Sequence, residues 1–117
     1  MMKKIYYLST CSTCQRIMKD LAIGADFIRQ DIRSEKITGE QLDEMKNLSG
    51  SYEALFSRVA LKYKSLGLKD KQLREEDYQN YILEEYTFLK RPVFIIDNEI
   101  FIGNSKKNVE AVIQKLT

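Results

Sequence analysis

The fold of this chain is decided by one stretch near its N-terminus, Lys3-Lys4-Ile5-Tyr6-Tyr7-Leu8-Ser9-Thr10-Cys11-Ser12-Thr13-Cys14. Residues 3–8 form a short apolar and aromatic run without helical spacing, which is typical of a strand. The run stops at Ser9-Thr10, a common composition where a helix begins. From there the apolar residues recur at helical spacing, at Cys14, Ile17, Met18 and Leu21. The stretch therefore predicts a strand followed by a helix, which Gly24 can end.

The middle of the chain has a different pattern. A second strand is expected around residues 27–32, with a turn near Ser34. Residues 38–91 then favour three helical segments rich in Lys, Glu, Asp and Gln. The first runs from a Thr38 cap to Gly50, the second opens at Ser51, and the third covers about residues 74–89. The expected buried faces are Leu42, Met45 and Leu48, then Leu55, Phe56, Val59 and Tyr63, then Tyr78, Tyr81, Ile82 and Tyr86.

The C-terminal part returns to strands after the only proline, Pro92. Residues 93–96 and 100–102 flank an Asp97-Asn98 turn and predict a β-hairpin. Residues 109–116 restore helical spacing, with Ser105 as a cap. The predicted order is β-α-β, helical insert, β-β-α. We expect one α/β domain with a mixed sheet, its core formed by residues 1–34 and 91–117 and its insert by about 38–90.

Composition excludes several classes of function. The 117 residues are 44% hydrophobic, and 19 Lys and Arg against 17 Asp and Glu give a net charge of only +2. Because the basic residues are spread along the chain, direct nucleic-acid binding is not expected. The longest apolar run, residues 93–96, is far below the roughly 20 residues of a membrane span, and the N-terminus has no apolar signal core. We therefore expect a cytoplasmic protein that binds no membrane.

The inventory of reactive side chains is also narrow. The chain has no histidine and only two cysteines, which excludes serine–histidine triads, Cys–His dyads and histidine-containing zinc sites. Its five glycines are too scattered for a dinucleotide or phosphate-binding loop. No run of acidic residues has the spacing of a calcium loop. We expect no bound metal or cofactor, which leaves thiol chemistry.

The two cysteines form a Cys11-Ser12-Thr13-Cys14 motif where the first strand meets the first helix. At a helix N-terminus the unsatisfied N–H groups and the positive end of the dipole favour a thiolate. Cys11 is therefore the predicted nucleophile. Cys14, one turn further and facing inward, is placed to resolve a mixed disulfide by bonding to Cys11. A C-x-x-C motif in this context indicates redox chemistry.

Other roles for the pair carry less weight. Half of a zinc site would need two further Cys or His ligands, which the chain lacks. A structural disulfide would close too small a loop to constrain the unfolded chain. Cys14 alone could be an inert core residue, since it shares its helical face with apolar side chains.

The motif, the helical insert and Arg91-Pro92 before a hairpin together resemble the arsenate reductase/Spx family of thioredoxin-like proteins. The resemblance covers nearly the whole chain and is carried by residues 5–11, by Tyr63-Lys64-Ser65-Leu66-Gly67-Leu68, and by Arg91-Pro92-Val93 leading to Ile102-Gly103. It implies a thioredoxin-like, glutaredoxin-type sheet with an inserted helical subdomain. It also implies a cis peptide before Pro92 that lies near Cys11.

For function, the resemblance implies that Cys11 attacks an oxyanion such as arsenate and that Arg91 binds it. Glutathione with glutaredoxin, or thioredoxin, would supply electrons. Arg58 falls within about one residue of the family's second arginine, and Arg16 lies one residue after the arginine that follows the family's catalytic cysteine. If the chain lacked the cysteine pair and Pro92, the expected role of Arg91 would be that of a surface residue or an ion-pair partner of Glu84 or Glu85.

The chain also departs from the arsenate-reducing members. Asn104 occupies the position of their third arginine, and Tyr7 that of their histidine. The second cysteine is instead a feature of the Spx-like branch, in which the pair is a redox switch and the protein binds the C-terminal domain of the RNA polymerase α subunit. Three readings stay open: an arsenate reductase, a small thiol–disulfide oxidoreductase, and an Spx-like regulator.

Overall fold

The structure, a computed structural model, describes residues 2–117 and divides the chain into two units. One unit combines the N-terminal part up to Lys36 with Arg91–Thr117, and the other is Ile37–Lys90. Every helix within residues 2–117 is too short or too polar to span a bilayer.

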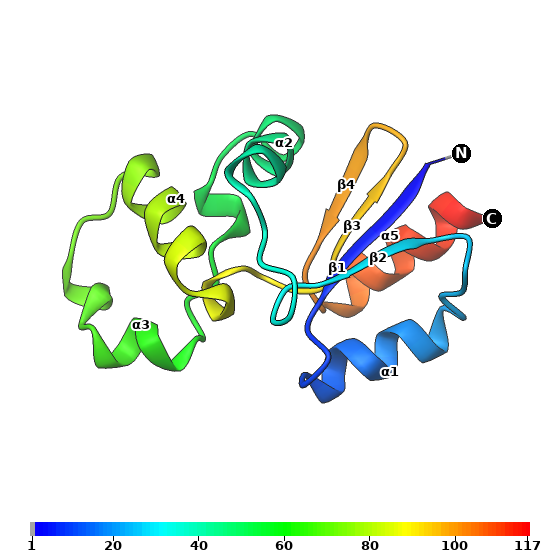
Figure 1. Ribbon diagram of the computed structural model, residues 1–117, viewed down its shortest axis with the longest axis horizontal. Helices are drawn as coiled ribbons and strands as arrows, with labels where there is room; N and C mark the ends of the chain where they lie inside the picture. The colour runs from blue at the N-terminus through cyan, green and yellow to red at the C-terminus, as the bar shows by residue number, and fades with distance from the viewer. Residues whose placement is uncertain (1) are drawn as a thin grey trace. The chain divides into compact units, whose positions relative to one another are not determined.

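The first unit is built on a four-stranded mixed sheet with the order β2-β1-β3-β4 (Figure 1). Its elements are β1 (Lys3–Tyr7), α1 (Ser12–Asp20), β2 (Ile28–Asp31), β3 (Val93–Ile96), β4 (Glu99–Ile102) and α5 (Lys106–Leu116). β1 runs parallel to β2 and antiparallel to β3, which in turn pairs antiparallel with β4. The β-α-β and β-β-α order predicted from the sequence is confirmed, and the fold is thioredoxin-like.

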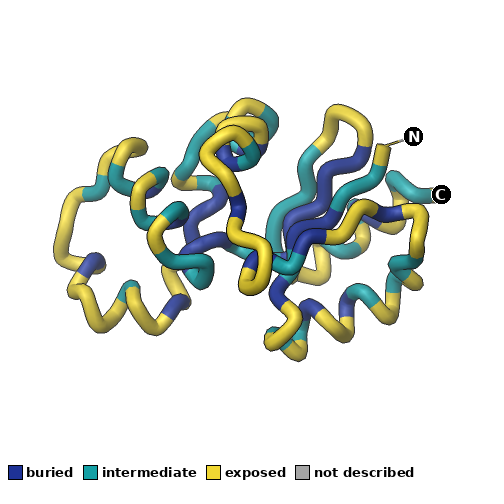
Figure 2. The backbone as a smooth tube through the Cα atoms, viewed as in Figure 1, coloured by how far each residue is buried: buried dark blue, intermediate teal, exposed yellow. Residues whose placement is uncertain are grey.

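The core of this unit lies between the sheet and helices α1 and α5. Ile5 and Phe94 are cross-strand partners on one face, and they pack with Ile17 of α1 and Val112 of α5. All four residues of β3 are buried, as expected for a central strand with an uninterrupted apolar sequence (Figure 2). Ser105 caps α5 through a hydrogen bond that its side chain accepts from the Asn108 N–H, as predicted.

The second unit contains the helices of the insert, α2 (Gly39–Ser49), α3 (Leu61–Ser65) and α4 (Glu75–Glu84). Three short 3-10 helices accompany them, at Glu53–Leu55, Leu68–Asp70 and Tyr86–Phe88. α2 begins and ends where the sequence predicts. The Thr38 side chain accepts a hydrogen bond from the Gln41 N–H, and Gly50 ends the helix at a φ of 98°.

The helix predicted to open at Ser51 and bury Val59 and Tyr63 is wrong. Phe56 has an extended backbone and forms an isolated bridge with Leu89. The Ser57 N–H donates to the Phe88 carbonyl at 2.7 Å, and the Lys90 N–H donates to the Leu55 carbonyl at 2.8 Å. These long-range hydrogen bonds replace those of a helix, and Val59 is 92% exposed. The same pairing explains why α4 ends at Glu84 instead of near Leu89.

Three tyrosines of the insert, Tyr63, Tyr78 and Tyr81, pack around Phe56. The Phe56 ring lies 5.0 Å from Phe88 and 4.9 Å from Tyr78, centroid to centroid. Tyr63 and Tyr81 also contact Phe56. Tyr78 and Tyr81 of the predicted stripe stabilise this unit through aromatic packing, whereas Tyr86 lies in the 3-10 helix Tyr86–Phe88 and not in α4.

Helix α1 ends earlier than predicted, because a different residue makes the reversal. The Ala22 N–H donates to the Lys19 carbonyl, and the Ile23 N–H donates to the Met18 carbonyl at 2.9 Å. This pattern is a Schellman motif, in which Ala22 takes the left-handed position with a φ of 52°. Gly24 lies two residues beyond it.

Replacing Ala22 with glycine should stabilise the protein. The left-handed conformation costs a residue with a Cβ roughly 1–2 kcal/mol, whereas the extra freedom of glycine in the unfolded chain costs about 0.4–1 kcal/mol. We expect Ala22→Gly to raise the free energy of unfolding by up to about 1 kcal/mol, measured by urea denaturation. Ala25→Gly is the control and should not stabilise. A lower midpoint for Ala22→Gly would contradict the strained cap.

Candidate active site

Cys11 lies at the N-cap of α1, where the chain turns from β1 into the helix. Its backbone is extended, with φ −93° and ψ 111°, and its side chain is half-buried. The Cys11 N–H donates to the Leu8 carbonyl at 3.0 Å, while the Cys11 carbonyl accepts from the Gln15 N–H at 3.1 Å. The first hydrogen bond closes a tight turn and the second begins the helix, so Cys11 is fixed on both sides.

The surroundings of Cys11 lower the pKa of its thiol below the ordinary value of 9.0. Partial burial raises the pKa, but four interactions together lower it by more. They are hydrogen bonds from the backbone N–H and the thiol of Cys14, the positive charge of Arg91, and a hydrogen bond from the Thr13 N–H. The unpaired amides at the start of α1 thus stabilise the thiolate, as the motif predicts.

Cys14 has the opposite character. It is fully buried on the same face of α1 as Ile17, and burial is the main reason that its pKa rises to about 11. The negative charge of a neighbouring Cys11 thiolate raises it as well, whereas the Leu8 N–H lowers it. Neither cysteine is in a disulfide. At neutral pH Cys11 is therefore the better nucleophile, and Cys14 is a protonated thiol within hydrogen-bond reach of it.

Arg91 and Pro92 belong to the same unit as the two cysteines and precede β3. The Arg91–Pro92 peptide bond is cis, Pro92 is buried, and its carbonyl accepts a hydrogen bond from the Gly103 N–H at 2.9 Å. Arg91 is half-buried, and its charge lowers the pKa of both thiols. The structure thus brings Cys11, Cys14 and Arg91 into one electrostatic group.

The other two predicted arginines have different surroundings. Arg16 lies on α1 and is exposed, away from the buried face formed by Cys14 and Ile17. Arg58 belongs to the Ile37–Lys90 unit and is also exposed. Asn104, at the position of the expected third arginine, is exposed as well.

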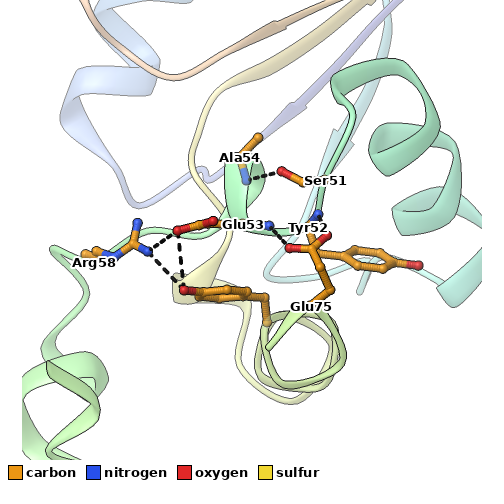
Figure 3. A network of polar contacts seen from close by, with 7 residues as sticks. Ser51, Tyr52, Glu53, Ala54, Arg58 and Glu75 are labelled. Atoms are coloured by element: carbon orange, nitrogen blue, oxygen red, sulfur yellow. Dashed lines mark hydrogen bonds and ion pairs between the residues drawn. The ribbon is translucent and has the colours of Figure 1, made fainter. Parts of the chain in front are cut away.

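Arg58 is held by a network within its own unit (Figure 3). Its Nη2 donates to Glu53 Oε2 at 2.7 Å and to the Tyr78 hydroxyl at 3.0 Å. The hydrogen bond to Glu53 is the main reason that the pKa of Arg58 is raised. Glu75 supports this arrangement, because its carboxylate accepts from the backbone N–H groups of Tyr52 and Glu53. Arg58 thus already has an anionic partner.

Two residues at this site are not among those predicted from the sequence. Asp31, at the end of β2, accepts a hydrogen bond from the Ser9 N–H at 3.2 Å. Gln15, on α1, donates from its side chain to the Ser9 carbonyl at 3.0 Å. An acidic residue that ends the strand parallel to β1 is the one signal that could have indicated Asp31 beforehand.

No group of three or more His, Cys, Asp or Glu side chains within residues 2–117 could hold a metal ion.

A comparison with protein families identifies the chain. Residues 6–112 match the ArsC family. The chain belongs to the ArsC family. The match includes the Cys11 motif, the helical insert and Arg91-Pro92.

Solved structures of related proteins share the fold. A protein related to the ArsC family from Bacteroides fragilis is 24% identical, with a TM-score of 0.79 over 96% of this chain and 99% of that one. A possible arsenate reductase from Streptococcus mutans is 25% identical, with a TM-score of 0.72 over 96% and 98%. An arsenate reductase from Vibrio cholerae is 18% identical, with a TM-score of 0.75 over 97% of each chain. No curated protein matches the chain.

The family and the cysteine geometry agree on the chemistry. ArsC proteins use thiols without a bound cofactor, and this chain presents an activated thiol beside a buried one. The chain is a thiol-based redox protein.

The pKa difference between the two thiols can be tested by alkylation. We expect iodoacetamide to modify Cys11 with an apparent pKa below 9.0, and Cys14 to stay unmodified until far higher pH. Arg91→Ala should raise the apparent pKa of Cys11 and slow its alkylation at pH 7, because a cation beside the thiolate is lost. Arg91→Lys keeps the charge and is the control. An unchanged alkylation profile in Arg91→Ala would contradict the electrostatic role of Arg91.

Proposed function

We propose that this protein is an arsenate reductase-like thiol oxidoreductase that depends on glutathione and glutaredoxin, with Cys11 as the nucleophile and Cys14 as the resolving thiol. One observation carries the proposal: the Cys11 sulfur sits at the N-terminus of α1 with a lowered pKa, in contact with a buried, protonated Cys14. The activated thiol and the thiol that resolves its adduct thus lie within one turn of α1.

The proposed reaction transfers two electrons from the thiol pair to arsenate. The Cys11 thiolate attacks arsenic(V) and forms an S–As bond, and a protonated oxygen leaves as water. The Cys14 sulfur then attacks the Cys11 sulfur and loses its proton. The S–As bond breaks, its electron pair stays on arsenic to give arsenite, and a Cys11–Cys14 disulfide forms.

The cycle closes when an external thiol reduces the disulfide. Two glutathione molecules, directly or through glutaredoxin, supply the two electrons and become oxidised glutathione. A thioredoxin could serve in the same step, because both donors act by thiol–disulfide exchange. Such donors are kept reduced in the cytoplasm, where we propose that this protein works.

Arg91 is the proposed main contact for the oxyanion, with Arg58 and Arg16 as further candidates. A guanidinium can donate two parallel hydrogen bonds to a tetrahedral oxyanion. The influence of the Arg91 charge on Cys11 supports its role. Because Asn104 carries no charge, we expect weaker oxyanion binding than in relatives with a third arginine.

An NADPH-coupled assay with glutathione, glutaredoxin, glutathione reductase and arsenate tests the mechanism. We expect Cys11→Ser to reduce the rate to that without enzyme, because the attacking atom is lost. In Cys14→Ser, glutathione must attack the Cys11 sulfur in place of Cys14, which breaks the S–As bond and releases arsenite. Without glutaredoxin this variant should therefore accumulate a mixed disulfide between Cys11 and glutathione, detected by mass spectrometry. Ser12→Ala, between the two cysteines, is the matched control and should stay active. Normal turnover by Cys11→Ser would refute the mechanism.

A wild-type protein that forms the disulfide under oxidant but reduces no arsenate would favour the second candidate. This is an Spx-like redox switch that binds the C-terminal domain of the RNA polymerase α subunit. The contact between the two thiols supports it equally, since a switch needs only a reversible disulfide. Oxidant-dependent binding of that domain, lost in both cysteine variants, would then be the expected result.

The ion pair of Glu53 and Arg58 gives a prediction about substrate affinity. If Arg58 binds the oxyanion, Glu53 competes with it for the same guanidinium, 2.7 Å away. Glu53→Gln should then lower KM for arsenate without changing kcat. The effect should be at most roughly fivefold, because an exposed ion pair contributes about 0.2–1 kcal/mol. Arg58→Ala should raise KM. An unchanged KM for arsenate in both variants would show that Arg58 does not bind the oxyanion.

A further inference from the structure

The residue two positions before the nucleophile is held from two sides. Ser9 lies between β1 and Cys11, and both of its backbone polar groups have side-chain partners. Its N–H donates to Asp31 Oδ1 at 3.2 Å, and its carbonyl accepts from Gln15 Nε2 at 3.0 Å. Asp31 ends β2 and Gln15 lies on α1, so a strand and a helix hold the two peptide groups that flank the Ser9 Cα.

Asp31 is itself held firmly in place. Its Oδ1 also accepts from the Arg33 N–H at 3.2 Å, and its carbonyl accepts from the Glu35 N–H at 2.8 Å. The backbone of Asp31 is the register partner of Tyr7 in β1, and the next N–H, that of Ile32, donates to the Tyr7 carbonyl at 2.9 Å. The carboxylate is therefore a rigid anchor at the end of the sheet.

The anchored residue belongs to the turn that places Cys11. This turn runs from Leu8 to Cys11 and is closed by the hydrogen bond between their backbone groups at 3.0 Å. Ser9 is its second residue. If Ser9 moved, Cys11 would leave the position at which the N–H groups of Thr13 and Cys14 reach its sulfur.

We propose that Asp31 is a positioning residue, which together with Gln15 holds Ser9 and so keeps the Cys11 sulfur at the N-terminus of α1. The proposal concerns the reactivity of Cys11 toward any electrophile. It therefore does not require that arsenate is the substrate.

Charge and position predict opposite effects for Asp31. A nearby negative charge disfavours a thiolate, so by charge alone the removal of Asp31 would lower the pKa of Cys11. A positioning role means that removal of the acceptor raises this pKa, because the thiolate loses its backbone donors. Asp31→Asn keeps an oxygen at Oδ1 without the charge, whereas Asp31→Ala removes the oxygen. The two variants therefore separate the two explanations.

The experiment is the pH dependence of iodoacetamide alkylation, with Cys11 identified by mass spectrometry. We expect Asp31→Ala to raise the apparent pKa of Cys11 and to slow alkylation at pH 7 by roughly three- to tenfold, which corresponds to about half to one pKa unit. Asp31→Asn should stay within twofold of wild type. Gln15→Ala should change the rate in the same direction as Asp31→Ala, because it releases the other side of Ser9.

Glu35→Ala is the matched control. The Glu35 side chain is exposed, and its contact with Asp31 is made by the backbone N–H, which donates to the Asp31 carbonyl at 2.8 Å and which alanine keeps. This variant should leave the Cys11 profile unchanged. Circular dichroism of every variant shows whether the fold is kept.

Two outcomes would overturn the proposal. A lower Cys11 pKa in both Asp31 variants would show that Asp31 acts by charge. An unchanged Cys11 pKa in folded Asp31→Ala would show that the bond to Ser9 does not control the sulfur. The alkylation test uses iodoacetamide and no arsenate. Its result for Asp31 is therefore valid even if the protein reduces no arsenate, and a negative result for Asp31 does not contradict reductase activity.

Discussion

The unpaired amides at the start of α1 are the constraint on which this site depends. A helix leaves its first N–H groups without partners, and here the Cys11 sulfur meets two of them, from Thr13 and Cys14. This contact requires that β1 ends within a few residues of α1. β1 pairs with β2 on one side and with β3 on the other, and this pairing fixes the position of the turn that follows Tyr7. The fold thus favours a thiolate without histidine, through backbone N–H groups, the Cys14 thiol and the charge of Arg91.

Elements defined by local sequence are those that could be predicted. The strand before the cysteines, the Thr38 cap, the Gly50 stop and the hairpin after Pro92 each depend on a few neighbouring residues. The helix expected from Ser51 fails because Leu55 and Phe56 bond to residues more than thirty positions away. Helical periodicity at Phe56 and Tyr63 is real, but it reflects shared packing in one aromatic cluster.

The site shows the same division between local and distant contacts. The cysteines could be recognised because their motif lies at a strand–helix junction, and Arg91 because it precedes Pro92. Asp31 could not be predicted from the sequence, because its partner, the Ser9 N–H, lies 22 residues earlier in the chain. Only the pairing of β1 with β2 brings the two residues together. The partnership of Arg58 with Glu53 and Tyr78 likewise depends on the tertiary fold of the insert.

Because Cys14 is buried, the two steps of the proposed cycle, attack by Cys11 and closure of the disulfide by Cys14, should depend differently on pH. Attack by Cys11 needs a thiolate, which the start of α1 favours by lowering the pKa of this thiol below 9.0. Closure of the disulfide needs Cys14 to give up a proton that burial holds to a pKa of about 11. A fall in pH should therefore slow closure of the disulfide more than attack, and so lengthen the lifetime of the Cys11 adduct.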